Sequence, residues 1–265
     1  MDLLSTKTSG PEATRPGPHS CPKEVRVRVL HQSDLCTLIL GDARDPATRP
    51  GEQYDLLCTD PPYGVKWESG WRAESFGQLQ GDDGTLDVPG LLAEWVRRLR
   101  NSRHVYVFGY RPDHLADQLC LGGTAELVWD KTHFGPGDLT KPWGPAHEPI
   151  AFAVHLRSQA PRESGGGRLS AWLRQGSVIT AKRPNCVKVR HPTEKPVALM
   201  SQLIESSTVR GELVVDPFAG TGSTLVAAIL TGRRAWGVEV EERYATIALD
   251  RIRRAEALVR QTTTI

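Results

Sequence analysis

Long apolar runs are absent from this 265-residue sequence. Its unbroken apolar stretches are a few residues long, whereas a helix that crosses a bilayer needs roughly 18, and the N-terminal residues lack the apolar core of a signal peptide. Cysteine is also scarce, with five scattered residues and no C-x-x-C pair. We therefore expect no membrane span, no disulfide framework and no metal site, and we expect a reducing, cytoplasmic location.

The sequence also lacks a large excess of either charge. Lysine and arginine number 33 against 31 aspartates and glutamates, so the formal net charge is only +2. Apolar residues make up 39% of the chain and charged residues 24%, which is typical of a globular protein and excludes a collagenous or wholly disordered one. The length predicts one or two domains with a sizeable core.

Basic charge is nevertheless concentrated in residues 157–190. Eight basic residues against one acid, Glu163, give this segment a net charge of +7, which leaves −5 for the rest of the chain. We interpret it as a basic insert, and residues 1–22, rich in Pro, Gly, Ser and Thr, as a flexible tail. Residues 23–156 and 191–265 are predicted to form one domain. The basic residues of the insert are Arg157, Arg162, Arg168, Arg174, Lys182, Arg183, Lys188 and Arg190.

Short apolar strands alternate with helical patterns through that domain. The alternation predicts an α/β fold with a doubly wound, mainly parallel sheet of seven strands. The final helix mixes basic and acidic residues, which we interpret as a solvated face. Strands are predicted near residues 35–40, 54–59, 105–108, 127–129, 150–154, 213–215 and 235–240, and helices near 91–99, 112–121, 196–207, 223–230 and 244–259.

Sharp polar turns follow three of the predicted strands, at residues 41–42, 60–63 and 216–222. In a doubly wound sheet, ligands bind beyond the carboxyl ends of the strands. We therefore expect the three turns to share one binding edge.

The turn at 60–63 reads Asp60-Pro61-Pro62-Tyr63. Two prolines fix φ and remove backbone donors, so the turn is rigid and presents carbonyl acceptors. A carboxylate beside a carbonyl suits an –NH2 group, which donates two hydrogens, and Tyr63 is placed to stack on the ring that carries the amine. The alternative is a plain β-turn, because Asp-Pro is a common turn start.

The turn at 216–222 reads Asp216-Pro217-Phe218-Ala219-Gly220-Thr221-Gly222 and precedes a predicted helix. The two glycines allow the backbone to approach a ligand closely, and the helix N-terminus attracts an anionic group. The spacing fits neither the dinucleotide fingerprint nor the P-loop. Glu239 follows about twenty residues later, an offset that suits a ribose diol; alternatively it begins the final helix.

Together the two motifs resemble the signatures of S-adenosylmethionine-dependent DNA amino-methyltransferases. The order, with Asp-Pro-Pro-Tyr first and the Gly-rich motif last, is similar to the permuted β class of that family. His191-Pro192-Thr193-Glu194-Lys195-Pro196, just before the second motif, also matches. The resemblance covers about residues 35–255 and implies the methyltransferase fold, with 23–156 and 191–265 as the catalytic domain.

The resemblance also implies roles for individual residues. Asp60 and Pro61 would grip the target amine in the rigid turn completed by Pro62, and Tyr63 would stack on a base extruded from the duplex. S-adenosylmethionine would be the methyl donor. The alternative for Asp42 is that it is a simple turn residue. The alternative for Lys195 is that it is a solvated lysine at a helix start. The implied cofactor-binding residues are Asp42, Lys195, Asp216, Pro217, Phe218, Gly220, Thr221, Gly222 and Glu239.

The basic insert lies where the family has its target-recognition region, which implies DNA as the partner and phosphate contacts from the eight basic residues. A solvated surface loop is the alternative. Because the insert is short for a long recognition site, two interpretations stay open: low sequence specificity, or help from the second subunit of a homodimer. A role in restriction-modification, with or without a partner endonuclease, is a further expectation.

The target base has two candidates, since adenine N6 and cytosine N4 are both exocyclic amines. Asp at the first position of the turn resembles the adenine enzymes of the permuted class, whereas Ser is more usual for cytosine, so adenine is expected. The competing functional class is a DNA-binding module with the same fold that transfers no methyl group. RNA and protein-glutamine methyltransferases carry the Gly-rich motif first, and the order here argues against them.

Overall fold

The computed structural model describes residues 26–62, 86–115, 119, 121–133, 140, 142–156, 175–183 and 194–263. Several sequence-based expectations lie outside these residues. They are the N-terminal tail, Tyr63, residues 191–193, and six of the eight basic positions of the insert.

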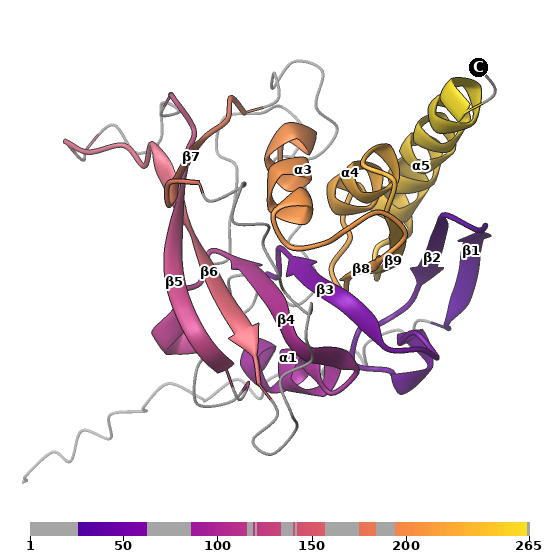
Figure 1. Cartoon of the computed structure of the whole chain (residues 1–265), viewed down its shortest axis with the longest axis horizontal. Helices are drawn as coiled ribbons and strands as arrows, with labels where there is room; N and C mark the ends of the chain where they lie inside the picture. The colour runs from indigo at the N-terminus through magenta and orange to yellow at the C-terminus, as the bar shows by residue number, and fades with distance from the viewer. Residues whose placement is uncertain are drawn as a thin grey trace, which may run out of the picture.

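In the described part of the chain, one nine-stranded sheet forms the centre of the molecule (Figure 1). Its order is β1-β2-β9-β8-β3-β4-β6-β5-β7. The strands are β1 (Arg28–Gln32), β2 (Cys36–Leu40), β3 (Tyr54–Thr59), β4 (Leu99–Phe108), β5 (Leu121–Asp130), β6 (His147–His155), β7 (Val178–Thr180), β8 (Leu213–Asp216) and β9 (Arg234–Glu239).

The five central strands, β2, β9, β8, β3 and β4, are parallel to one another. Along the chain, β8 is followed by its neighbour β9 on one side, and β3 by its neighbour β4 on the other. The strand order therefore reverses between β3 and β8, and this switch point is where ligands bind in open α/β sheets. β1 and β6 run antiparallel to the strands beside them.

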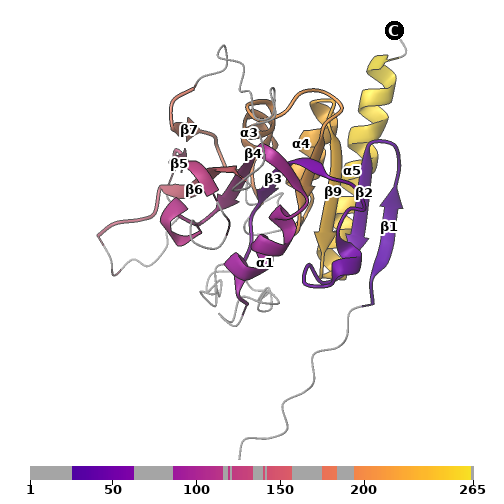
Figure 2. The same ribbon diagram turned by 60° about the horizontal axis from the view of Figure 1, so that its bottom comes forward.

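Helices cover both faces of the sheet, as Figures 1 and 2 show. α3 (Val197–Glu205), α4 (Ser223–Leu230) and α5 (Glu242–Thr263) pack on one face, and α1 (Val88–Val96) packs on the other. Alternate residues of β3 point to the two faces of the sheet. Leu56 and Cys58 face the side covered by α3, α4 and α5, and Leu57 faces α1. All six β3 residues are buried, as expected of a central parallel strand whose two faces are both covered.

The mainly parallel, doubly wound sheet predicted from the sequence is confirmed, but the count of seven strands is wrong. β1 is an edge strand with only partial burial, so it has no continuous apolar run to reveal it. β7 has three residues and lies within the basic insert, where it pairs with β5. Leu121, expected to end a helix, instead opens β5; a 3-10 turn occupies Pro112–His114.

None of the described helices is both long and apolar enough to cross a membrane.

Candidate active site at the carboxyl ends of the central strands

The three polar turns predicted to share one edge of the sheet do so. Asp42 follows β2, Asp60 follows β3, and Asp216 and Glu239 end β8 and β9. The Gly41 amide donates to the Glu239 carbonyl at 2.9 Å, which ties the first of these strand ends to the last.

Asp216 is buried at the switch point and accepts three hydrogen bonds. Its donors are the Thr59 hydroxyl at 2.6 Å, the Thr224 hydroxyl at 2.6 Å and the Phe218 amide at 3.0 Å. Burial raises the pKa of Asp216 to about 6, against the three hydrogen bonds, which lower it. The side chain thus joins β3 to β8 and to the first turn of α4 while staying close to its ionisation point at neutral pH.

The Gly-rich turn uses two left-handed backbone positions, Gly220 at φ 52° and Gly222 at φ 82°. Glycine adopts such φ values without the steric cost that other residues incur. A Cβ at Gly222 would lie 3.0 Å from the Ala248 Cβ, so that position is closed by α5. Among the residues that the structure describes, a Cβ at Gly220 would meet nothing within 4 Å, so the backbone there borders open space, which fits a bound ligand.

Glu239 lies beside that open space and is only 8% exposed. Its carboxylate accepts from the Gly220 amide at 2.8 Å and from the Glu241 amide at 2.7 Å. Burial raises the pKa of Glu239 to about 7, although both amide donors favour the ionised form. At neutral pH this carboxyl group can therefore accept hydrogen bonds from ligand hydroxyls or donate one.

Asp42 is more exposed than Glu239 and is paired with Arg44. The Arg44 amide donates to Asp42 Oδ1 at 2.8 Å, and its guanidinium Nε lies 3.0 Å from both carboxylate oxygens. Burial alone would raise the pKa of Asp42, but the Arg44 hydrogen bonds hold it below its usual value. Asp42 is therefore an anionic acceptor at neutral pH.

Asp60 heads the Asp-Pro-Pro turn directly after β3, and Pro61 behind it is buried. Lys195 Nζ lies 2.8 Å from Asp60 Oδ2 and 2.8 Å from Glu148 Oε1. Lys195 is thus a buried residue of the Asp60 site, not a solvated lysine at a helix start. Its expected pairing with a cofactor carboxylate stays a prediction.

Arg251 of α5 corrects the interpretation of the final helix as a solvated face. Its guanidinium donates to the Thr221 carbonyl at 2.7 Å and to the Thr221 hydroxyl at 2.9 Å. It also forms an ion pair with Glu194 at 3.1 Å. Arg251 therefore joins the Gly-rich turn to the segment before α3. Periodicity alone does not separate it from its exposed neighbours.

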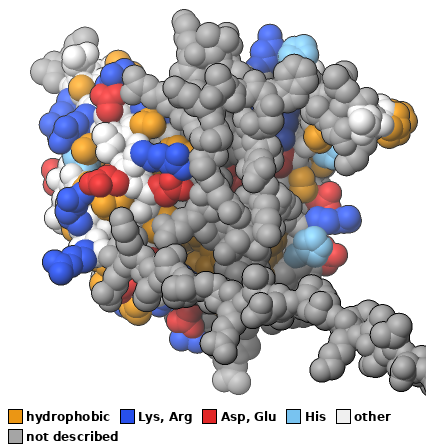
Figure 3. Space-filling view, turned by 180° about the vertical axis from the view of Figure 1, so that it is seen from behind, with side chains coloured by type: hydrophobic (Ala, Val, Ile, Leu, Met, Phe, Trp, Pro, Cys, Tyr) orange, Lys and Arg blue, Asp and Glu red, His pale blue; other side chains and the backbone are white. Residues whose placement is uncertain are grey.

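Two basic residues of the insert, Lys182 and Arg183, fall within the described residues. Both are exposed and follow β7 at the edge of the sheet that carries Asp60, because Thr180 pairs with Asp130 at the carboxyl end of β5. On the face shown in Figure 3, by contrast, Lys and Arg side chains are interspersed with Asp and Glu.

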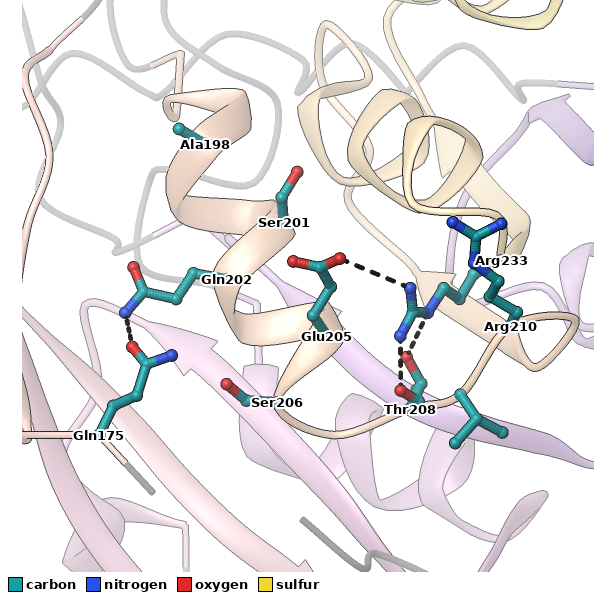
Figure 4. Close-up of a pocket in the computed structure, with 10 residues that line it drawn as sticks. Gln175, Ala198, Ser201, Gln202, Glu205, Ser206, Thr208, Arg210 and Arg233 are labelled. Atoms are coloured by element: carbon teal, nitrogen blue, oxygen red, sulfur yellow. Dashed lines mark hydrogen bonds and ion pairs between the residues drawn. The ribbon is translucent and has the colours of Figure 1, made fainter. Parts of the chain in front are cut away.

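A separate cavity of about 690 Å³ lies at the opposite edge of the sheet (Figure 4). α3 and the loop that follows it, up to Arg210, supply most of the lining, and Gln175 and Arg233 complete it. Arg233 is held by the Thr208 carbonyl at 2.6 Å and the Thr231 carbonyl at 2.5 Å, so it braces the loop. None of the predicted site residues that fall within the described ranges lines this cavity.

Comparison with known proteins identifies the family. The model of the N6/N4 methylase family, described as DNA methylase, matches residues 54–250 and so includes the Asp60 turn, the Gly-rich turn and Glu239. The chain belongs to the N6/N4 DNA methylase family. The resemblance drawn from the two motifs is thereby confirmed.

Relatives span most of the chain. The Escherichia coli K12 protein YubD is 31% identical over 233 residues, which cover 86% of this chain and 94% of YubD. YhdJ of the same strain, named as a DNA adenine methyltransferase, is 27% identical over 247 residues and 82% of each chain.

Solved structures of DNA methyltransferases share the fold. The M1.HpyAVI–SAM complex matches with a TM-score of 0.61 and 19% identity, over 82% of this chain and 99% of that one. The cytosine-N4-specific PvuII DNA methyltransferase matches with a TM-score of 0.60 and 16% identity, over 82% of this chain and 86% of that one.

Four side chains that hold this site together were not predicted from the sequence. Thr59 and Thr224 bind Asp216, Glu148 binds Lys195, and Arg251 binds Thr221. For Thr224 a signal existed, since it lies in the first turn of the helix that follows the Asp216 turn and a buried carboxylate needs hydrogen-bond donors. Thr59, Glu148 and Arg251 are distant in sequence from their partners, and only folding brings them together.

Proposed function

We propose that this protein transfers a methyl group from S-adenosylmethionine to the N6 amine of adenine in DNA. The observation that carries the proposal is the position of Asp60, at the carboxyl end of β3 and beside Asp216 at the switch point of the sheet. The Asp60 carboxylate, which would hold the amine, and the Gly-rich turn, which would hold the cofactor, therefore lie on either side of the switch point of the sheet. Family membership supports methyl transfer as the chemistry.

The residues present fit the cofactor. Gly220 borders open space, and Glu239 presents a buried carboxyl group beside it, which suits a ribose diol. Asp42, on the adjacent strand end, supplies a further anionic acceptor near Glu239. Phe218 and Pro217 complete the turn. S-adenosylmethionine, when bound, supplies an electrophilic methyl group.

Asp60 and Pro61 act on the amine. The Asp60 carboxylate and the Pro61 carbonyl accept hydrogen bonds from the two N–H groups of the amine. These hydrogen bonds turn the nitrogen lone pair away from the base plane and toward the methyl group. As the new C–N bond forms, the bond between the methyl group and the donor sulfur would break and leave its electron pair on sulfur as a neutral thioether. Positive charge then grows on nitrogen, and the Asp60 carboxylate stabilises that charge. One N–H proton is then lost to water, so the methylated amine is neutral. Fixed orientation of the amine contributes much of the remaining rate.

DNA binding is assigned to the basic insert. Lys182 and Arg183 are exposed at the edge that holds Asp60, where phosphates flanking an extruded base would lie. The other insert arginines and lysines are included in this proposal on their charge alone. Salt-dependent affinity is the expected signature.

Adenine is preferred to cytosine because the turn begins with Asp and because YhdJ is named for adenine. The test incubates the protein with methyl-labelled S-adenosylmethionine and DNA of mixed sequence, digests the DNA to nucleosides and separates them by mass spectrometry. Label in N6-methyladenine supports the proposal. Label in N4-methylcytosine overturns the choice of base, and binding of cofactor and DNA without any label overturns methyl transfer itself.

A further inference from the structure

Four charged side chains form a row of ion pairs that starts at the Asp60 turn. Lys195 Nζ lies 2.8 Å from Asp60 Oδ2 and 2.8 Å from Glu148 Oε1. The row continues from Glu148 Oε2 to Lys131 Nζ at 2.9 Å. Lys195 precedes α3, Glu148 belongs to β6, and Lys131 follows β5. Three separate parts of the chain are therefore linked, through Lys195, to the carboxylate that is proposed to hold the target amine.

The ammonium group of Lys195 is enclosed. Its side chain is 6% exposed, and Nζ lies 5.1 Å from the centre of the Phe108 ring and 5.8 Å from that of Trp129. A cation in such surroundings is stable only with anionic partners, to which the aromatic faces add attraction. The rings and the two carboxylates together leave Nζ little freedom to move.

Lys195 and Glu148 are both charged at neutral pH. Burial alone would lower the pKa of Lys195, but Asp60 and Glu148 raise it above its usual value. Burial alone would raise the pKa of Glu148, yet Lys195 and Lys131 bring it down to about 2. Glu148 therefore stands between two cations as a permanent anion.

Glu148 and Asp60 compete for the same ammonium group. If Glu148 lost its charge, Lys195 would be attracted more strongly to Asp60. It would then compete with the N–H groups of an incoming amine for the Asp60 carboxylate oxygens. With Glu148 ionised, the attraction of Lys195 is divided between two carboxylates on opposite sides.

We propose that Lys195 and Glu148 are positioning residues for methyl transfer: Lys195 orients the Asp60 carboxylate through Oδ2, and Glu148, held by Lys131, keeps Lys195 from being drawn fully onto Asp60. The inference rests on the proposed function, because it takes Asp60 as the group that holds the amine. Neither residue touches the reacting atoms in this scheme.

Glu148→Gln tests this most directly, because it removes a charge and keeps the shape. We expect kcat to fall between about 10-fold and 100-fold, as for a misplacement of the reacting group by about 1 Å, while the Kd for S-adenosylmethionine changes less than about twofold. Lys195→Met should lower kcat at least as much. In the double variant the loss should not exceed that of Lys195→Met alone, since Glu148 acts through Lys195.

Glu126→Gln is the matched control. Glu126 lies on the neighbouring strand β5 and pairs with Arg111 at 3.2 Å, but its side chain is 39% exposed and it is not one of the four side chains of the row. This variant should keep the wild-type kcat. Crystal structures of the wild type and Glu148→Gln supply a readout that needs no activity. In the variant, Lys195 Nζ is expected to move away from residue 148, and the Asp60 carboxylate is expected to rotate with it.

The outcomes separate the two proposals. A wild-type protein that methylates no DNA overturns the proposed function, and this inference falls with it. An active wild type whose Glu148→Gln variant keeps its kcat, or loses kcat while Asp60 stays in place, overturns only the positioning role. The Lys195→Met variant could instead lose cofactor affinity and keep its kcat at saturating cofactor. That result would assign Lys195 to cofactor binding and would also overturn the positioning role.

Discussion

The Thr59 hydroxyl donates a hydrogen bond of 2.6 Å to the Asp216 carboxylate and thereby joins the two strands between which the sheet order reverses. The backbone pairing of β3 with β8 is short, matching Leu56 with Val214 and Leu57 with Val215. The side-chain bond therefore extends the connection to the strand ends, where Asp60 and the Gly-rich turn begin. The spacing between the proposed amine site and the proposed cofactor site should therefore depend on this contact.

Thr59→Val removes that hydroxyl at nearly constant shape. Because Asp216 is buried, losing a donor should cost about 1–3 kcal/mol of unfolding free energy, measured by urea denaturation. Thr246→Val is the control, since the Thr246 hydroxyl only caps the Glu242 carbonyl on the exposed side of α5; it should change stability by less than about 0.5 kcal/mol. Equal losses in the two variants would contradict the role given to Thr59.

Gly220 and Gly222 should respond differently to alanine. Both have positive φ, so each substitution should cost about 1–2 kcal/mol of stability. Gly222→Ala adds a contact with Ala248 and should be the less stable variant. Gly220→Ala places its methyl group in the open space assigned to the cofactor, so the Kd for S-adenosylmethionine should rise about tenfold or more, by calorimetry.

The two glycine variants also test the location of the cofactor. Gly222→Ala, once folded, should bind S-adenosylmethionine more tightly than Gly220→Ala, because its methyl group points toward α5. The reverse order of affinities would place the cofactor elsewhere.

The central strands and the acidic residues at their ends were predictable, because each buried apolar strand is followed at once by a polar residue of the site. β3, β8 and β9 are short, largely apolar stretches that end in, or directly before, an acidic residue, and the turns after β3 and β8 carry proline or glycine. Such a pattern has few other structural explanations. The parallel sheet, the edge shared by the three polar turns and the family followed from these features, and the structure and the family match confirm them.

The edge strands and the ion-pair partners were not predictable in the same way. β1 has one face toward solvent, and β7 gains its strand conformation only from pairing with β5. The partnership of Lys195 with Glu148 depends on β6 lying beside β4, which is a property of the whole sheet. Arg251 resembles the other arginines of α5 until the helix is packed against Thr221.

Arg251 and Arg254 offer a matched comparison on α5. Arg251→Met removes the bonds to Thr221 and Glu194 and should cost about 1–3 kcal/mol of unfolding free energy, with weaker binding of S-adenosylmethionine. Arg254→Met breaks an exposed ion pair with Asp250 and should cost less than about 1 kcal/mol, with cofactor binding unchanged. Thermal unfolding with and without cofactor measures both. Equal behaviour would show that Arg251 is an ordinary surface residue.

Glu239 should make stability depend on pH in a defined direction. In the unfolded chain its carboxyl group loses its proton near pH 4.5, whereas in the folded protein it does so near pH 7. Between these values the folded state holds one more proton than the unfolded state, so its contribution to stability falls as the pH rises. At about 1.4 kcal/mol per unit, the fall amounts to about 3 kcal/mol.

Glu239→Gln cannot ionise and should lose this dependence. Relative to wild type, the variant should gain about 3 kcal/mol of unfolding free energy between pH 4.5 and 7 and then stay level. Urea denaturation at a series of pH values measures the difference. Glu242→Gln, at a carboxylate whose side chain is 69% exposed, is the control and should keep the wild-type profile. A Glu239→Gln profile parallel to wild type would show that Glu239 does not hold its proton at neutral pH.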